Sequence, residues 1–135
     1  MTMTRDEIRQ APADDYMNEA QLAFFRKLLE GLRTETMDSI EAAKQQLANP
    51  PEMNDEADRA AYEEESRLAL RIVDREGRLL PKIEAAIKRI SNDDFGYCRE
   101  SGEPIGIPRL LARPTAELCA EVKTLNERKE LNYRH

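Results

Sequence analysis

Two long stretches with the periodicity of a single helix face, separated by two prolines, constrain the fold of this chain more than any other feature. In the first stretch, apolar or small residues recur at steps of three or four, which places them along one side of a helix. They are Leu22, Phe25, Leu29, Leu32, Thr36, Ile40, Ala43 and Leu47. Asn18 is the expected N-cap of this helix, and Pro50 and Pro51 end it, because consecutive prolines cannot continue a helix.

The second stretch runs from Asp58 to Asn92, which is 35 residues and about 50 Å of helix. Its expected inward stripe is again spaced by three or four and consists of Ala61, Glu64, Leu68, Ile72, Arg75, Leu79, Ile83, Ala86 and Ile90. Two such stripes joined by a short loop predict an antiparallel coiled-coil hairpin. Because the stripes carry mainly small residues toward the loop, we expect the free end of the hairpin to bury little apolar surface.

The chain as a whole is predicted to be mainly α, with the long antiparallel coiled-coil hairpin on a small globular base. Residues 1–16 are predicted to be an extended N-terminal arm, and residues 17–94 the helical region, with the hairpin tip at about 50–60. Residues 95–135 change to turn-rich sequence, which predicts a degenerate zinc-finger-like knuckle or small β-hairpin followed by a C-terminal helix. Thr115 is the expected cap of that last helix.

Charge is segregated along the hairpin. Residues 52–66 contain seven acidic side chains and one basic one, whereas residues 67–90 contain seven basic and three acidic ones. Ordinary solvated helix faces are one interpretation of this pattern. The other is a probe, with a basic shaft that docks on a partner and an acidic tip that is delivered into it.

Overall charge and composition exclude several classes of function. The net charge of −6 argues against a protein that wraps nucleic acid, which needs a dominant basic surface. The one histidine, His135, argues against a catalytic triad or an internal imidazole–metal site. Since there is no apolar run of transmembrane length and no apolar core of signal-peptide type, we expect a cytoplasmic protein without membrane contact.

The two cysteines form half of a zinc-binding pattern. Cys98, Ser101, Cys119 and Val122 have the spacing of a C-x2-C-x17-C-x2-C zinc ribbon, but serine and valine stand at the second and fourth positions. Two thiolates leave zinc half coordinated, so we expect no bound metal and interpret the cysteines as small core residues. A weak two-thiol zinc site and a redox-active thiol pair remain as alternatives.

Several motifs in register resemble one bacterial family. They are Tyr16-Met-Asn-Glu-Ala-Gln-Leu22, Asp55-x-x-Asp58-Arg-Ala60-Ala, Asp94-Phe-Gly-Tyr-Cys98, Ile105-Gly-Ile and Ala112-Arg-Pro-Thr-Ala116. From about Tyr16 to Arg128 the chain is similar to the DksA family of RNA polymerase-binding transcription factors. With two of the four zinc cysteines replaced, it resembles the zinc-independent members of that family.

The resemblance implies a specific function. Family members bind RNA polymerase rather than DNA, and their coiled coil enters the secondary channel. With guanosine tetraphosphate (ppGpp) as effector they repress ribosomal RNA promoters and activate some biosynthetic promoters in the stringent response. We therefore expect a non-enzymatic regulator, monomeric in its free form, with RNA polymerase and ppGpp as partners and no tightly bound cofactor.

The resemblance also implies site residues. Asp55, Asp58 and Ala60 match the tip that faces the polymerase active site, and Arg75 matches a shaft residue that supports polymerase contact. The positions that match the family's ppGpp pocket are Leu79, Lys82, Arg113 and Lys123. Three of these four are basic, as a highly anionic ligand requires.

Two other functions compete with this interpretation. A Gre-like transcript-cleavage factor also places a coiled coil in the same channel, and its tip carboxylates hold a second Mg²⁺ for hydrolysis. A generic coiled-coil adaptor or holdase explains the helices, but it leaves Asp55, Asp58 and the incomplete zinc ribbon without a role.

Overall fold

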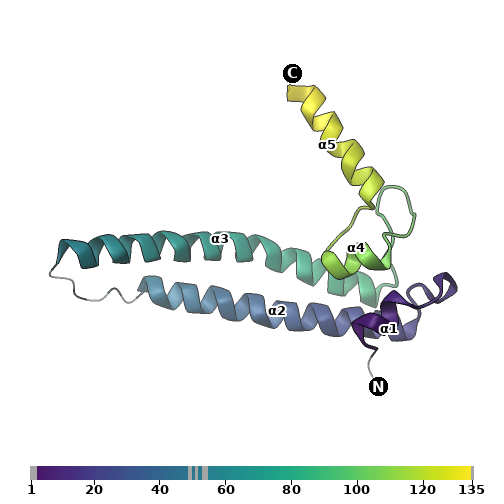
Figure 1. Ribbon diagram of the computed structural model, residues 1–135, viewed down its shortest axis with the longest axis horizontal. Helices are drawn as coiled ribbons and strands as arrows, with labels where there is room; N and C mark the ends of the chain where they lie inside the picture. Colours follow the sequence, from purple (N-terminus) through teal and green to yellow (C-terminus); the bar gives the residue numbers. More distant parts are fainter. Residues whose placement is uncertain (1–2, 49, 51, 53–54, 135) are drawn as a thin grey trace. The chain divides into compact units, whose positions relative to one another are not determined.

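The computed structural model describes residues 3–48, 50, 52 and 55–134 (Figure 1). The helices are α1 (Arg5–Arg9), the 3-10 helix η1 (Ala13–Asp15), α2 (Glu19–Ala48), α3 (Glu56–Ser91), α4 (Ile107–Ala112) and α5 (Ala120–Arg134). Within these described residues no β-strand forms, so the predicted mainly α fold is confirmed. Of the predicted tip, residues 51, 53 and 54 lie outside the described part. None of the described helices combines the length and the apolarity that a bilayer crossing requires.

The two long helices agree with the periodicity of the sequence. The Asn18 side chain caps α2, because its Oδ1 accepts a hydrogen bond from the Gln21 backbone N–H at 2.9 Å. Helix α3 begins two residues earlier and ends one residue earlier than the predicted stretch. The chain divides into two compact units that do not follow chain order: a hairpin unit, Gly31–Glu84, and a base unit, Met1–Glu30 with Ala85–His135.

In the hairpin unit, α2 and α3 run in opposite directions along a narrow seam (Figure 1). Thr36 and Ala43 of α2, which lie on the expected stripe, are buried there, and so is Ala69 of α3, which does not. The expected stripe of α3 is wrong in this part: Ala61, Glu64, Leu68 and Arg75 are exposed. The inward face instead follows Ser66 and Ala69, because a close approach of two helices admits Ala where Leu68 would hold them apart.

The base unit has the larger apolar core. Phe25 contacts Phe24 and Phe95, with ring centroids 5.2 Å and 5.3 Å apart. The other buried apolar side chains of this unit come from α1, α2, α3, the knuckle and α4, and they are Ile8, Leu29, Ala86, Ile90, Cys98, Ile105, Leu110 and Leu111. The core therefore joins segments that are distant in the sequence, and most of the unit's hydrophobic stabilisation arises there.

The extended arm predicted for residues 1–16 is wrong. Thr4 caps α1 by accepting from the Glu7 backbone N–H at 3.2 Å, while its hydroxyl donates to the Glu7 carboxylate. This threonine N-cap starts the helix that places Ile8 in the core with 1 % of its surface exposed. A short helix therefore forms in a segment where no periodic pattern of apolar residues predicts one.

The C-terminal helix also begins later than predicted, at Ala120 rather than at Thr115. Backbone carbonyls that a helix would use accept hydrogen bonds from the knuckle and from α4 instead. The Arg99 N–H donates to the Glu117 carbonyl at 2.9 Å, and Arg109 Nε donates to the Leu118 carbonyl at 3.0 Å. Tertiary contacts therefore hold residues 114–119 in a non-helical path.

Candidate functional site

The tip carboxylates lie at the N-terminus of α3. Asp55 is its N-cap, because its Oδ1 accepts from the Ala57 backbone N–H at 3.0 Å. Asp58 lies in the first helical turn, and Asp55, Asp58 and Ala60 are all exposed. The helix start thereby fixes the position of one carboxylate and holds the second one turn along, where the positive end of the helix dipole stabilises it.

Arg75 projects from the middle of α3 into solvent. Its side chain is 76 % exposed, and its guanidinium lies 3.4 Å from the Glu76 carboxylate. Arg67 pairs with Glu64 at 2.6 Å, and this strong hydrogen bond lowers the pKa of Glu64. Exposed ion pairs of this kind contribute little to stability, so these cations remain accessible to a partner.

The four positions expected to bind ppGpp are divided between the two units. Leu79 and Lys82 belong to the hairpin unit, where Leu79 is half-buried and Lys82 exposed. Arg113 and Lys123 belong to the base unit, and both are exposed. Arg113 ends α4 and Lys123 lies in the first turn of α5.

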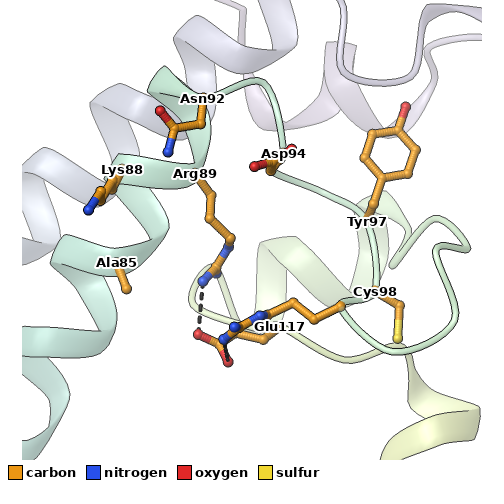
Figure 2. Close-up of a pocket in the computed structure, with 9 residues that line it drawn as sticks. Ala85, Lys88, Arg89, Asn92, Asp94, Tyr97, Cys98 and Glu117 are labelled. Carbon is orange, nitrogen blue, oxygen red and sulfur yellow. Dashed lines mark hydrogen bonds and ion pairs between the residues drawn. The ribbon is translucent and has the colours of Figure 1, made fainter.

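The knuckle is built from turns rather than from a β-hairpin. A single bridge pairs Tyr97 with Pro104, and the Cys98 N–H donates to the Glu103 carbonyl at 2.8 Å. The Gly102 N–H closes the turn by donating to the Cys98 carbonyl at 2.9 Å. This loop carries Tyr97 and Cys98 beside the end of α3 (Figure 2).

A tyrosine hydroxyl fastens the N-terminal segment to the knuckle. Tyr16 Oη donates to the Gly96 carbonyl and accepts from the Gly106 N–H at 2.9 Å. Burial raises the pKa of Tyr16, which keeps the phenol protonated as this pattern requires. Gly96 has φ +95°, and a Cβ there would lie 2.7 Å from Met17 Cγ, so only glycine fits against this segment.

The hydroxyl of Ser101 interacts with the thiols of both cysteines, Cys98 and Cys119. The Ser101 Oγ lies 3.8 Å from Cys119 Sγ and also hydrogen-bonds the Cys98 thiol. Burial raises the pKa of Cys98, but hydrogen bonds from the Ser101 hydroxyl and from the backbone N–H groups of Cys119, Ser101 and Glu100 outweigh it and lower the pKa to about 6. These hydrogen bonds favour the thiolate of Cys98 over its thiol.

This donor set does not fit zinc. Ser101 is a poor ligand, Val122 has no donor atom, and two thiolates leave two of the four tetrahedral positions without a protein ligand. Across the described part of the chain, no group of three or more His, Cys, Asp or Glu side chains is arranged to hold a metal ion. The hydroxyl–thiolate contacts and the surrounding core hold the knuckle together in the region where a ribbon has its metal.

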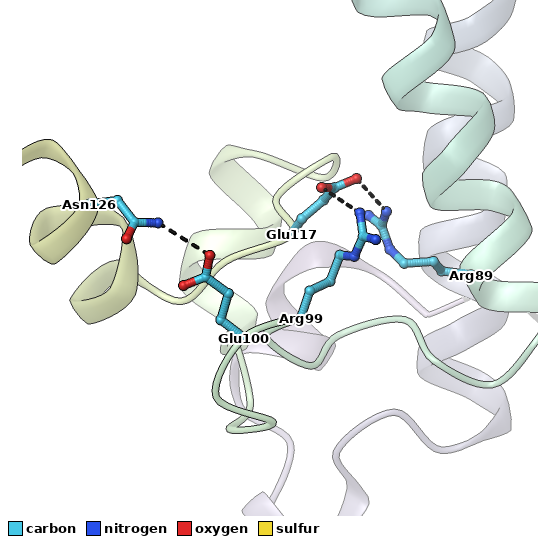
Figure 3. Close-up of polar contacts among 5 residues, drawn as sticks. All are labelled: Arg89, Arg99, Glu100, Glu117 and Asn126. Carbon is cyan, nitrogen blue, oxygen red and sulfur yellow. Dashed lines mark hydrogen bonds and ion pairs between the residues drawn. The ribbon is translucent and has the colours of Figure 1, made fainter. Parts of the chain in front are cut away.

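A carboxylate that the sequence analysis did not single out ties the knuckle to α3. Glu117 accepts from Arg89 Nη1 at 2.8 Å through one oxygen and from Arg99 Nη1 at 3.1 Å through the other (Figure 3). In addition, the Asn126 side-chain amide of α5 donates to the Glu100 carboxylate at 3.5 Å. No motif marks Glu117, because its partners lie 28 and 18 residues away along the chain.

Comparison with known proteins covers nearly the whole chain. Residues 21–90 match the family described as DnaK suppressor protein DksA, N-terminal domain, and residues 93–128 match the prokaryotic dksA/traR C4-type zinc finger. The chain is 48 % identical over 126 residues to the RNA polymerase-binding transcription factor DksA of Escherichia coli K12, covering 90 % of this chain and 82 % of that protein. The corresponding protein of Salmonella typhimurium is 46 % identical with the same coverage.

The structure of transcription factor DksA2 from Pseudomonas aeruginosa is similar over 97 % of this chain and 98 % of that one, with 45 % identity and a TM-score of 0.79. Sequence and fold thus agree across both the helical region and the knuckle. The chain belongs to the DksA family.

Proposed function

We propose that this protein is a transcription regulator that binds RNA polymerase through the secondary channel and acts on initiation without binding DNA. The observation that carries this proposal is membership of the DksA family, whose named relatives above are RNA polymerase-binding transcription factors. The net charge of −6 is consistent with a protein partner rather than a nucleic-acid backbone. The protein acts by binding and carries out no reaction of its own.

The tip supplies the regulatory effect. Asp55 and Asp58 present two exposed carboxylates at the start of α3, and Ala60 adds almost no bulk beside them. Carboxylates attract the bound metal ions and basic side chains that surround a polymerase active site. The thin seam formed by Thr36, Ala43 and Ala69 keeps the hairpin narrow enough to enter a channel.

The shaft supplies the docking. The guanidinium of Arg75 is exposed and loosely paired, so it can exchange Glu76 for an acidic or carbonyl acceptor on the polymerase. The net positive charge of residues 67–90 favours an acidic channel rim.

The nucleotide ppGpp binds where the factor meets the polymerase, through Leu79, Lys82, Arg113 and Lys123. Three cations match its pyrophosphate groups, and the leucine provides apolar contact. With ppGpp the protein represses ribosomal RNA promoters and activates some biosynthetic promoters, as part of the stringent response. It does so as a cytoplasmic monomer without zinc, since the donor set of the knuckle does not fit that metal.

The alternative of a Gre-like cleavage factor is not supported by these relatives, which belong to the DksA family throughout. A cleavage assay on backtracked complexes discriminates the two activities. The regulator described here leaves the cleavage rate unchanged.

The decisive experiment measures initiation from a ribosomal RNA promoter with purified polymerase, in a zinc-depleted buffer, with and without ppGpp. Repression that deepens with ppGpp supports the proposal. Asp58→Asn should retain polymerase binding and lose repression, whereas the matched control Asp38→Asn, an exposed acid on α2, should behave as the parent. Loss of binding in Asp58→Asn would show that the tip is an anchor instead.

The nucleotide site is tested separately. Lys82→Ala should reduce the additional repression caused by ppGpp more than the repression seen without it. The exposed Lys44→Ala serves as the control. An unchanged ppGpp response in Lys82→Ala contradicts the assignment of this lysine.

A further inference from the structure

We propose that the base unit contains a binding site for inorganic phosphate, formed where α3 ends against the knuckle. A pocket of about 440 Å³ opens there, lined by Lys88, Arg89, Asp94, Arg99 and Glu117 among others (Figure 2). None of these residues is a tip residue, the shaft residue Arg75 or a ppGpp position, although Lys88 and Arg89 contribute to the positive charge of residues 67–90. The proposal concerns the chain alone and does not rest on its proposed action on polymerase.

The first argument is an excess of hydrogen-bond donors. Lys88 is exposed at the pocket and has no ion-pair partner among the described residues, and the Asn92 amide lines the same space. Arg99 is 63 % exposed and uses only Nη1 on Glu117. Figure 2 shows the Lys88 ammonium and the Asn92 amide pointing away from Arg89, so a rotamer change of these exposed side chains is needed to bring them over the pocket. There, together with the Arg99 guanidinium, they provide the charge-assisted hydrogen bonds that an oxyanion accepts.

The second argument is an unsatisfied nitrogen. Arg89 is 14 % exposed and pairs with Glu117 through Nη1, but its Nη2 is buried and has no hydrogen-bond partner in the described part of the chain. A buried N–H without an acceptor is unfavourable. Because this nitrogen exposes less than 1 Å² of surface, the guanidinium has to turn about its contact with Glu117 before a phosphate oxygen in the pocket can supply the missing acceptor.

The two carboxylates of the pocket, Glu117 and Asp94, favour an oxyanion that carries a proton over one that carries none. Glu117 is already neutralised by Arg89 and Arg99, so it does not repel an anion strongly. Asp94 has no ion-pair partner within the described residues, and it can accept a hydrogen bond only from a ligand that carries a proton. Inorganic phosphate carries one at neutral pH, whereas sulfate does not and a phosphomonoester, with a second pKa of about 6, mostly does not.

The test is a titration of the whole chain, followed by amide NMR at pH 7 and constant ionic strength, with inorganic phosphate, sulfate and phenyl phosphate as probes. We expect saturable shifts confined to residues 85–99 and 117 with inorganic phosphate. Affinity for sulfate and phenyl phosphate should be about tenfold weaker, which corresponds to about 1.4 kcal/mol. Equal responses to phosphate and sulfate, or shifts spread over the whole base unit, would overturn the proposal.

Variants identify the contributing side chains. Lys88→Ala and Arg99→Ala should each weaken phosphate binding about tenfold, while Lys44→Ala on the hairpin unit leaves it unchanged. Asp94→Asn should remove the preference for phosphate over sulfate, because an amide donates to either anion. All four side chains are exposed, and circular dichroism verifies that each variant retains its helices. Unchanged phosphate affinity in both Lys88→Ala and Arg99→Ala contradicts the proposed site.

Discussion

Arg89 Nη1 donates to Glu117 Oε1 at 2.8 Å, and this contact joins the last turns of α3 to the segment that leads into α5. Arg99 of the knuckle donates to the other oxygen at 3.1 Å. One carboxylate therefore links three parts of the base unit beside Cys98, which lines the same pocket. In a complete zinc ribbon the metal performs such cross-linking; here ion pairs and hydrogen bonds share that role.

Glu117→Gln should lower the free energy of unfolding by about 1–3 kcal/mol, because it leaves the largely buried Arg89 with a weaker acceptor. Urea denaturation followed by circular dichroism measures the change. The matched control is Glu64→Gln, which removes an acid from an ion pair whose two side chains are both 58 % exposed. The control should leave the denaturation midpoint unchanged, and an equal loss in both variants would refute a structural role for Glu117.

Tyr16→Phe should also cost about 1–3 kcal/mol, because the buried Gly96 carbonyl loses its donor and the Gly106 N–H loses its acceptor. Cleavage of residues 3–16 by a protease at low concentration should become faster as this segment detaches. Tyr133→Phe is the control, since Tyr133 is 95 % exposed. If the Tyr16 variant is as resistant to the protease and as stable as the parent, the hydrogen bonds of the Tyr16 hydroxyl do not contribute to stability.

The thiolate of Cys98 predicts a pH dependence of stability. Its pKa is lowered to about 6 in the folded chain, whereas an unfolded thiol titrates at about 8.5. The unfolded chain thus binds one more proton between these values, so stability rises with pH across this window. The contribution is complete above about pH 8.5 and is lost as the pH falls through about 6.

Ultraviolet absorbance of the thiolate, followed as a function of pH, and denaturation at about pH 6 and about pH 8.5 measure these effects. Cys98→Ser should abolish the titration near pH 6 and flatten the pH dependence, and Cys119→Ser should retain both. The opposite pattern would assign the thiolate to Cys119.

Removal of metal should leave the fold intact. A zinc chelator is expected not to change the helical signal, because Cys98, Ser101, Cys119 and Val122 do not supply a ligand set. The double substitution Ser101→Cys with Val122→Cys restores four thiols at ribbon spacing and should create tight zinc binding and sensitivity to the chelator. Unfolding of the parent chain by the chelator would show that two thiolates still hold a structural metal.

The sequence correctly predicts the helices that depend on local periodicity. It does not predict the helix boundaries that are set by tertiary contacts. The steps of three and four in α2 identified buried Phe25, Leu29, Thr36 and Ala43, and Asn18 was correctly expected to cap that helix. The start of α5 was missed because Arg99 and Arg109 engage the carbonyls of Glu117 and Leu118, a contact between distant segments. The Thr4-x-x-Glu7 pattern is a local sequence signal for the start of a helix, and in the structure Thr4 is the N-cap of α1.

Some residues of the candidate site could likewise be predicted from the sequence, and others could not. Asp55 and Asp58 were found through a motif and Arg75 through the family resemblance, and all three are exposed. Glu117 and Arg89 belong to no motif, since only the folded chain brings them within 2.8 Å. The polymerase-facing and nucleotide-binding roles remain predictions, because they concern partners rather than contacts within the chain.

The phase of the hairpin seam gives a final test, since periodicity alone selected Leu68 as the inward residue and the structure buries Ala69. Leu68 is 47 % exposed, and Ala69 is 2 % exposed. Ala69→Leu should therefore overpack the narrow seam and cost about 1–3 kcal/mol, whereas Leu68→Ala should have a much smaller effect. Hydrogen exchange resolves where the loss occurs. Amides of residues 56–73 should exchange faster in Ala69→Leu, while those near Phe25 and Phe95 in the base unit keep their protection. A larger loss in Leu68→Ala than in Ala69→Leu would instead support the seam expected from the sequence.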